Sequence, residues 1–360
     1  MNSRSLSIAI VSFLIGTSAL SAGCGDSGET TTGTMSSSSS SGSGGTGGTG
    51  GSGGTGGTGG KVSAPETVAA FDPSKGQFVE GLDIKDGIAY VGAVLTGEVF
   101  TVDLAKHDIK HHGAMPAFTQ NQGALVGLTL GSDGAVYAAL NITNPAGPKT
   151  GIYKIPAGGG TATLFASDPA MVFANDVRFD DAGNLFATDS MSGSVFKIAK
   201  DGTVTKWLSH MLLTPDPTVC GVQTNFHLGI NGIVRNGDAY YATNTDRASI
   251  VKIPVNADGS AGTPEIFLPT DCATLSGVDG IAVDEATGDL IVAINYKDTV
   301  VRIGKDKAIK NIASGDPLQS PASLYIDAPA KAVYVTSAAF AALATDPSKA
   351  KPALVKLPLE

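Results

Sequence analysis

The chain has 360 residues, of which 47 are glycine, so its length suits one large domain or two small ones. Its formal net charge of −9, without any block of basic residues, argues against a nucleic-acid partner, because phosphates require clustered Lys and Arg. A content of 42% hydrophobic and 16% charged residues excludes a chain that is disordered throughout.

Residues 1–23 have the composition of an export signal. Arg4 is their only charged residue, a largely apolar stretch follows it, and small residues stand directly before Cys24. The apolar stretch is too short to span a membrane comfortably. Leu20–Cys24 resembles a bacterial lipobox, although Ser21 stands where an aliphatic residue is usual, and this resemblance implies that Cys24 is lipidated. An ordinary cleaved signal peptide is the alternative.

Residues 24–60 are expected to be the lipidated cysteine and a disordered tether. Positions 25–60 are rich in Ser and Thr and hold 16 Gly, so they cannot bury a core. Gly25 stands where, in enteric bacteria, an Asp signals retention at the inner membrane. We therefore expect an exported lipoprotein at the outer membrane or cell surface rather than at the inner membrane.

Residues 61–360 contain an internal repeat with a period of 43 to 56 residues. Each copy begins with a short apolar strand, passes through a Gly- or Asp-containing turn into a second strand, and ends with a third strand rich in Val, Ile, Lys and Arg. Turns such as Asp133-Gly134 stand where hairpins need Gly, Asn or Asp. The six copies begin at residues 80, 126, 175, 231, 279 and 322.

Six copies of this length predict an all-β fold, a six-bladed β-propeller formed by residues 61–360 as one domain. The last copy ends too close to Glu360 to include a fourth strand. The stretch Glu66–Phe71 precedes the first copy and has the pattern of the missing strand. We therefore expect this N-terminal strand to pair with the last blade and close the ring, which removes a sheet edge.

The first strand of each blade lines the central channel of a propeller, so the first residue of each copy should face the axis. These positions hold Glu80, Val126, Asn175, Asn231, Asp279 and Ala322. Two carboxylates and two amide carbonyls, without thiol or imidazole, are hard oxygen ligands that suit Ca²⁺, with Mg²⁺, Mn²⁺ and Zn²⁺ as alternatives. The competing explanation is that these side chains only cap strand starts by bonding nearby backbone amides.

This ring resembles that of the gluconolactonase/regucalcin superfamily, the senescence marker protein/gluconolactonase/luciferin-regenerating-enzyme-like propellers, to which diisopropylfluorophosphatase and the paraoxonases are related. The resemblance covers residues 66–358 and implies a catalytic calcium or similar ion held by Glu80, Asn175, Asn231 and Asp279. It further implies that the ion polarises a lactone carbonyl or phosphoryl oxygen. Asp279 would then act as general base or nucleophile, with Asn175 beside it as the other catalytic residue.

The second strands run back toward the same end of the channel, so their last residues should form an outer wall. That wall would consist of Asn141, Asp189, Ser190, Asn244, Thr245, Asn295 and Tyr296. Such side chains suit a polyhydroxylated or ester-bearing small-molecule substrate, although each taken singly is as well explained by a stabilised turn. His227, four residues before Asn231, is the histidine expected closest to the site, with structural packing as the alternative.

Two cysteines remain after Cys24. Cys220 stands in the loop that enters the fourth blade and Cys272 in the loop that enters the fifth, and these loops should be neighbours on one face. In an exported protein this arrangement predicts a Cys220–Cys272 disulfide.

These features lead us to expect a calcium-dependent, gluconolactonase-like hydrolase of lactones or related esters. The propeller should be monomeric, bind a small-molecule substrate, and meet the membrane only through its lipid anchor. Two alternatives stay open: a surface binding propeller whose calcium is structural, and an organophosphate-type hydrolase or a lyase on the same scaffold.

Overall fold

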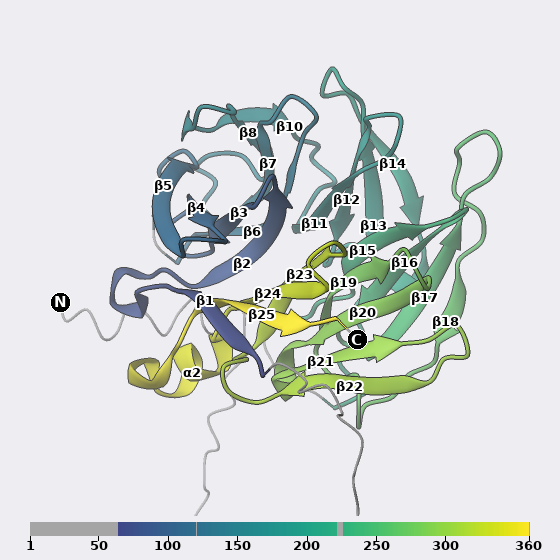
Figure 1. The fold of residues 1–360 in the computed structure, drawn as a ribbon. Helices are drawn as coiled ribbons and strands as arrows, with labels where there is room; N and C mark the ends of the chain where they lie inside the picture. The colour runs from purple at the N-terminus through teal and green to yellow at the C-terminus, as the bar shows by residue number, and fades with distance from the viewer. Residues whose placement is uncertain (1–63, 120, 222–225, 360) are drawn as a thin grey trace, which may run out of the picture. The chain divides into compact units, whose positions relative to one another are not determined.

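The structure is a computed structural model that describes residues 64–119, 121–221 and 226–359. These residues form six sheets arranged in a ring as the blades of a β-propeller (Figure 1), which confirms the predicted all-β fold. The predicted signal peptide 1–23, Cys24 and the tether up to residue 60 lie outside the described residues. Within the described ranges, no helix is long and apolar enough to cross a membrane.

The first three blades follow one another along the chain, each running from an innermost to an outermost strand. Blade 1 comprises β2 (Val79–Lys85), β3 (Ile88–Ala93), β4 (Glu98–Asp103) and β5 (Asp108–Ala114), with the short parallel β9 (Gly160–Thr161) at its edge. Blade 2 comprises β6 (Gly123–Leu130), β7 (Val136–Ile142), β8 (Gly151–Ile155) and β10 (Thr163–Ala166). Blade 3 comprises β11 (Ala174–Phe179), β12 (Leu185–Asp189), β13 (Ser194–Ile198) and β14 (Val204–Ser209).

The last three blades repeat this order. Blade 4 comprises β15 (Ile230–Asn236), β16 (Ala239–Asn244), β17 (Ser249–Pro254) and β18 (Glu265–Leu268). Blade 5 comprises β19 (Val278–Asp284), β20 (Asp289–Ile294), β21 (Thr299–Ile303) and β22 (Ile309–Ser314). Blade 6 comprises β23 (Pro321–Asp327), β24 (Ala332–Ser337), β25 (Ala353–Pro358) and β1 (Glu66–Ala70). The short helices are α2 (Phe340–Thr345), η2 (Pro73–Lys75), η3 (Met211–Leu213), η4 (Asn295–Lys297) and η5 (Pro347–Lys349).

The ring is closed by strands from the two ends of the described chain. The purple β1 lies beside the yellow β25 in Figure 1, and the two strands pair antiparallel from Glu66 opposite Lys356 to Ala70 opposite Ala353. On the channel side, Thr336 Oγ1 of β24 donates a 2.5 Å hydrogen bond to the carbonyl oxygen of Glu80 in β2. The predicted closure by an N-terminal strand is confirmed.

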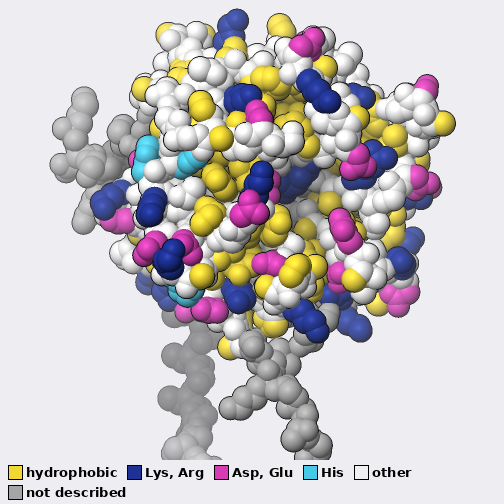
Figure 2. Space-filling model, turned by 45° about the horizontal axis from the view of Figure 1, so that its top comes forward, with side chains coloured by type: hydrophobic (Ala, Val, Ile, Leu, Met, Phe, Trp, Pro, Cys, Tyr) yellow, Lys and Arg dark blue, Asp and Glu magenta, His cyan; other side chains and the backbone are white. Residues whose placement is uncertain are grey.

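The hydrophobic core lies between neighbouring blades because side chains alternate along each strand. In β20, Leu290, Val292 and Ile294 pack in the cluster that blade 5 shares with blade 4, whereas Ile291 and Ala293 pack in the cluster shared with blade 6. A middle strand therefore buries both of its faces, which explains its unbroken apolar sequence. Figure 2 shows hydrophobic side chains in the recesses of one face, among interspersed charges of both signs.

Every innermost strand has a β-bulge at the same place. In β19, for example, the pairing register passes from Val278 opposite Ile294 to Ile281 opposite Val292, so Asp279 and Gly280 share a single partner position. The equivalent shifts fall at residues 80–81, 126–127, 175–176, 231–232, 279–280 and 322–323. The repeated bulge places six equivalent residues around the axis, and a bulge of this kind commonly re-aims a side chain.

Candidate metal centre

Five of the six first bulge residues line one cavity at an end of the channel: Glu80, Val126, Asn175, Asn231 and Asp279. The cavity itself has a volume of about 30 Å³, which is room for an ion or a water molecule, and it opens toward solvent. The structure therefore brings together all four residues that the sequence predicts as metal ligands. Three of them are almost fully enclosed, with exposed fractions of 7% for Glu80 and 4% each for Asn175 and Asn231.

Hydrogen bonds orient the two amide side chains of this set. Asn175 Nδ2 donates to Ser190 Oγ at 2.9 Å, and Asn231 Nδ2 donates to Thr245 Oγ1 at 3.0 Å. Because each amide nitrogen is engaged by a hydroxyl group, the carbonyl oxygen Oδ1 is the atom that each residue can offer to a cation. The amides are therefore prepared to act as oxygen ligands.

Asp279 is held in the same manner from its own blade. Asn295 Nδ2, which follows the second strand of blade 5, donates a 3.1 Å hydrogen bond to Asp279 Oδ2. The same nitrogen lies 3.3 Å from the carbonyl oxygens of Ser320 and Pro321 in the next blade. Asn295 thus engages one oxygen of the Asp279 carboxylate, and a hydrogen bond from Asn231 also acts to lower the pKa of this group.

Four equivalent positions at the ends of the second strands make up what we call the support ring: Asn141, Ser190, Thr245 and Asn295. Each side chain donates to a carbonyl just before, or beside, the bulge of the following blade. Asn141 reaches Ala174 at 2.7 Å, Ser190 reaches Ile230 at 2.5 Å, and Thr245 reaches Val278 at 2.8 Å. The support ring therefore fixes the spacing of neighbouring blades next to the candidate ligand residues.

The electrostatics of the cavity favour a cation. Burial raises the pKa of Glu80 well above its usual range, and the charges of Asp279 and Asp176 raise it further. Burial also raises the pKa of Asp279 to about 7, which the hydrogen bond from Asn295 opposes and the charge of Asp176 reinforces. A divalent ion placed between these carboxylates would offset both effects, and the set of two carboxylates and two amide oxygens fits a hard ion such as Ca²⁺.

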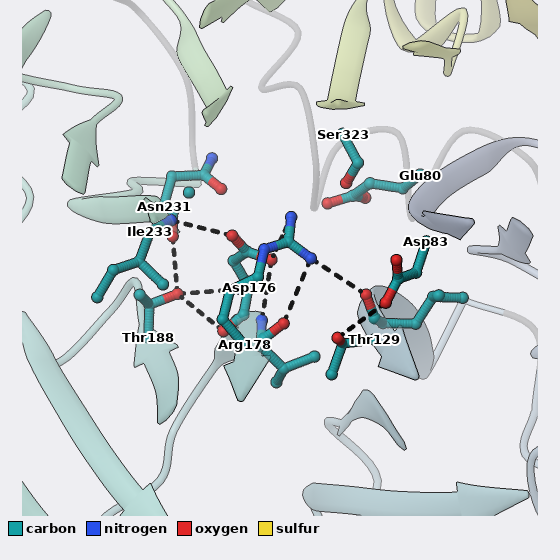
Figure 3. Close-up of polar contacts among 12 residues, drawn as sticks. Glu80, Asp83, Thr129, Asp176, Arg178, Thr188, Asn231, Ile233 and Ser323 are labelled. Carbon is teal, nitrogen blue, oxygen red and sulfur yellow. Dashed lines mark hydrogen bonds and ion pairs between the residues drawn. The ribbon is translucent and has the colours of Figure 1, made fainter. Parts of the chain in front are cut away.

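A buried ion pair lies next to the ligand set in the channel (Figure 3). Arg178 Nη2 lies 3.3 Å from Asp176 Oδ1, while Asp176 Oδ2 accepts a 2.9 Å hydrogen bond from the backbone N–H of Ile233. Burial raises the pKa of Asp176 although Arg178 opposes the shift. Asp176 was not among the residues predicted for the site, although the sequence carries a signal for it: it occupies the second bulge position, where blades 1, 2, 4 and 5 have glycine.

The residues predicted to form an outer wall divide into two groups. Thr245, Asn295 and Tyr296 line the cavity. The side chains outside its lining are Asn141, Asp189, Ser190, Asn244 and His227. His227 instead places Nδ1 3.5 Å from Oδ2 of the buried Asp246.

Three lining residues were not found from the sequence. Phe173 stands just before β11, Leu228 just before β15, and Phe340 at the start of α2. Phe173 and Leu228 lie two and three residues before a ligand residue, a signal that the repeat register carries. Phe340 belongs to the connection between β24 and β25, which among the described blades is the one that contains an α-helix, so the repeat gave no signal for it.

The Cys220–Cys272 disulfide predicted from the sequence is confirmed, with an S–S distance of 2.07 Å. It joins the loop that enters blade 4 to the loop that enters blade 5. Within the described part of the chain, no three His, Cys, Asp or Glu side chains gather as a metal-binding group. The candidate set contains two carboxylates and reaches four ligands only with its amide oxygens.

Comparison with known proteins gives one family match. The family model described as the SMP-30/Gluconolactonase/LRE-like region matches residues 145–339. No curated protein matches the chain.

Solved structures share the fold. A regucalcin from Agrobacterium tumefaciens, described as a calcium-binding protein, is 21% identical with a TM-score of 0.59, over 82% of this chain and 93% of that one. A luciferin-regenerating enzyme is 15% identical with a TM-score of 0.59, over 78% and 91% of the two chains. A putative gluconolactonase is 14% identical with a TM-score of 0.57, over 82% and 91%.

Proposed function

The chain belongs to the SMP-30/gluconolactonase/LRE-like family, and on this premise we propose that it is a divalent-cation-dependent hydrolase of lactones or related esters, with Ca²⁺ as its ion. The observation that carries the proposal is the convergence of Glu80, Asn175, Asn231 and Asp279 on one cavity. The calcium-binding description of the similar regucalcin supports the choice of ion, and the putative gluconolactonase supports the choice of substrate class.

In this proposal the residues of the cavity have different roles in hydrolysis. A bound Ca²⁺ would supply a Lewis acid that polarises the substrate carbonyl and lowers the pKa of water. Glu80, Asn175 and Asn231 would hold the ion through side-chain oxygens. Asp279, oriented by the hydrogen bond that Asn295 makes to its Oδ2, would accept the proton of the attacking water or attack the carbonyl carbon itself. Asn175 would orient the carbonyl beside the ion.

The first experiment combines metal analysis of the purified full-length protein with assays before and after chelation. The assay set contains sugar lactones, acyl lactones, aryl esters and an organophosphate triester. We expect bound calcium, turnover of lactones or esters, loss of turnover on chelation and recovery when calcium is added back. Calcium without turnover of any compound would indicate a binding propeller, turnover of the triester alone an organophosphate-type hydrolase, and absence of calcium affinity would overturn the proposal.

Two variants separate ion binding from chemistry. Glu80→Gln should weaken calcium binding at least about tenfold, because it removes one of two ligand charges. Asp279→Asn should abolish turnover even when enough calcium is supplied to fill the site. Asp258→Asn is the matched control, since Asp258 is an exposed turn residue that bonds only Ser260. Full activity of Asp279→Asn with calcium bound would remove Asp279 from the chemistry.

We also propose that the protein is a lipoprotein anchored outside the cytoplasm through Cys24. The Cys220–Cys272 disulfide supports this, because stable disulfides belong to oxidising compartments. When the chain is expressed with its leader in a bacterial host, the wild type should partition into the detergent phase and Cys24→Ala into the aqueous phase. Equal partitioning of both would contradict the lipid anchor.

A further inference from the structure

We infer that the substrate carries an apolar substituent, so that alkyl- or aryl-substituted lactones and esters are preferred over polyhydroxylated sugar lactones. This inference rests on the proposed function and names the substrate class of the same cavity. It comes from the composition of the cavity wall and from the hydrogen bonds that engage the polar residues around it.

The wall of the cavity outside the ligand set is hydrophobic. Apart from the four candidate ligands, the lining contains Thr245 and Asn295 together with five apolar or aromatic side chains. Those five are Val126, Phe173, Leu228, Tyr296 and Phe340. They come from blade 2, from the entries to blades 3 and 4, from η4 and from α2, so apolar surface reaches the cavity from several directions around the ring.

Thr245 and Asn295, two of the polar lining residues outside the ligand set, already have partners. Thr245 Oγ1 accepts from Asn231 and donates to the carbonyl oxygen of Val278, and Asn295 donates to Asp279. Both therefore support the ligand set. Among the described lining residues outside the ligand set, this leaves the hydroxyl group of Tyr296 as the one polar side-chain group available to recognise a substrate hydroxyl.

The polar side chains that would suit a sugar are engaged elsewhere. Asp189 Oδ2 accepts hydrogen bonds from the backbone N–H groups of Val172 and Phe173, at 2.6 and 2.9 Å. Asn244 Nδ2 donates to the carbonyl oxygens of Leu212 and Thr214, at 3.0 and 3.1 Å. Asp189 and Asn244 thus hold loop backbone next to the cavity. Binding substrate hydroxyls, as predicted from the sequence, would require these hydrogen bonds to break.

The free energies of burying apolar and polar groups predict how strongly this wall should favour one lactone over another. Each methylene buried against such a surface adds up to about fourfold to kcat/KM when it is held in the transition state. A substrate hydroxyl that loses water without gaining a partner costs about tenfold or more. The two effects act in the same direction, so an alkyl lactone and a sugar lactone with the same ring should differ by at least about 100-fold.

The test uses the full-length protein with calcium and three six-membered lactones: δ-valerolactone, δ-decalactone and glucono-δ-lactone. Each kcat/KM is divided by the uncatalysed rate constant of the same lactone. We expect δ-decalactone to exceed δ-valerolactone by at least about tenfold, and glucono-δ-lactone to be the poorest substrate. A preference for glucono-δ-lactone would overturn the inference and leave the proposed function standing.

A second measurement keeps the inference separate from turnover. Lactams resist hydrolysis, so calorimetry with a pentyl-substituted δ-lactam and with gluconolactam measures recognition alone. Tighter binding of the pentyl lactam supports an apolar site even if no lactone is turned over, an outcome that would reject only the hydrolase. Tighter binding of gluconolactam, or no binding of either lactam, overturns the inference.

Phe340 and Leu343 provide a matched pair of variants. Both belong to α2, both are 6% exposed and both pack in the same core cluster, but only Phe340 lines the cavity. Phe340→Ala should lower the ratio of kcat/KM for δ-decalactone over δ-valerolactone about fivefold, and Leu343→Ala should leave that ratio unchanged. A purely structural effect lowers both rates together, so an unchanged ratio in folded Phe340→Ala and in the milder Phe340→Leu would contradict the role assigned to this wall.

Discussion

Asn295 Nδ2 lies 3.1 Å from Asp279 Oδ2, and through this hydrogen bond the support ring reaches a carboxylate of the candidate metal centre. The same amide lies close to the backbone of blade 6. One side chain thus connects the orientation of Asp279 to the packing of two blades.

Replacing Asn295 by Ala should therefore weaken the cation site as well as the fold. We expect the calcium dissociation constant to rise about tenfold and the free energy of unfolding to fall by about 1 kcal/mol, because Asp279 and two carbonyls lose a donor. Isothermal titration and urea unfolding measure the two effects. Asn311→Ala, on the exposed surface of β22, is the control, and equal calcium affinity in both variants would contradict the positioning role.

The second bulge position should not accept a side chain between blades 2 and 3. A Cβ atom added to Gly127 would lie 2.2 Å from the carbonyl oxygen of Asn175, far inside van der Waals contact. Gly127→Ala should lower the free energy of unfolding by about 1–3 kcal/mol. Gly158→Ala, where an added Cβ meets nothing within 4 Å, should change it little. Denaturant unfolding measures the free energy of unfolding of both variants. Equal values would show that blades 2 and 3 can move apart to accept the added Cβ atom without loss of stability.

The disulfide should make a large contribution to stability. It links residues 52 positions apart, and closing a loop of that size in the unfolded chain stabilises the folded state by about 2–4 kcal/mol. The double variant Cys220→Ala, Cys272→Ala should show a lower urea midpoint. Reductant should shift the wild type toward that value and leave the double variant where it is. A wild type insensitive to full reduction would indicate that the loops are held by packing alone.

Asp246 should make the stability depend on pH. Burial raises the pKa of Asp246 from 3.8 to about 6, an effect that the nearby His227 opposes. Between pH 4 and 6 the folded state therefore binds more protons than the unfolded state, and the contribution of Asp246 to the free energy of unfolding falls as the pH rises. Above pH 6 the buried charge lowers stability by about 1–2 kcal/mol relative to pH 4.

Asp246→Asn removes this dependence. The melting temperature of the variant minus that of the wild type should be larger at pH 7 than at pH 4. The reason is that the amide is uncharged at both pH values, whereas the buried carboxylate of the wild type is charged at pH 7. Thermal melts at both pH values, with Asp201→Asn as an exposed control, measure the difference. The same offset at both pH values would contradict the assignment.

The positions of the four candidate metal ligands could be predicted because the same β-bulge recurs in every innermost strand. In blades 1, 2, 4 and 5 the first bulge residue is followed by glycine, as Asp279 is by Gly280 and Asn231 by Gly232. In those four blades the backbone of the next blade approaches the glycine closely, so its spacing in the sequence reports the geometry directly.

The partners of the outer polar residues could not be predicted in the same way. An Asn at a strand end is equally suited to bind a substrate, a water molecule or a neighbouring carbonyl. Asn244 bonds the carbonyls of Leu212 and Thr214, and those atoms lie in a loop of blade 3 whose path no repeat specifies. Phe340 was missed for the related reason that it belongs to α2, a helix that among the described blades only blade 6 inserts between its second and third strands.

The closure of the ring also determines which strand pairing a pulling force on the N-terminal side would act on first. The segment before Glu66 reaches the propeller at β1, the same strand that pairs with β25 to join the two ends of the chain. A pull on that segment therefore acts on the β1–β25 pairing before it acts on any other blade. Since Thr336 of β24 bonds the backbone of Glu80, a ring opened at this seam would release the first-blade carboxylate from the other three donors. An ion bound at the axis would then join the first blade to the other three donors and resist the opening of this seam.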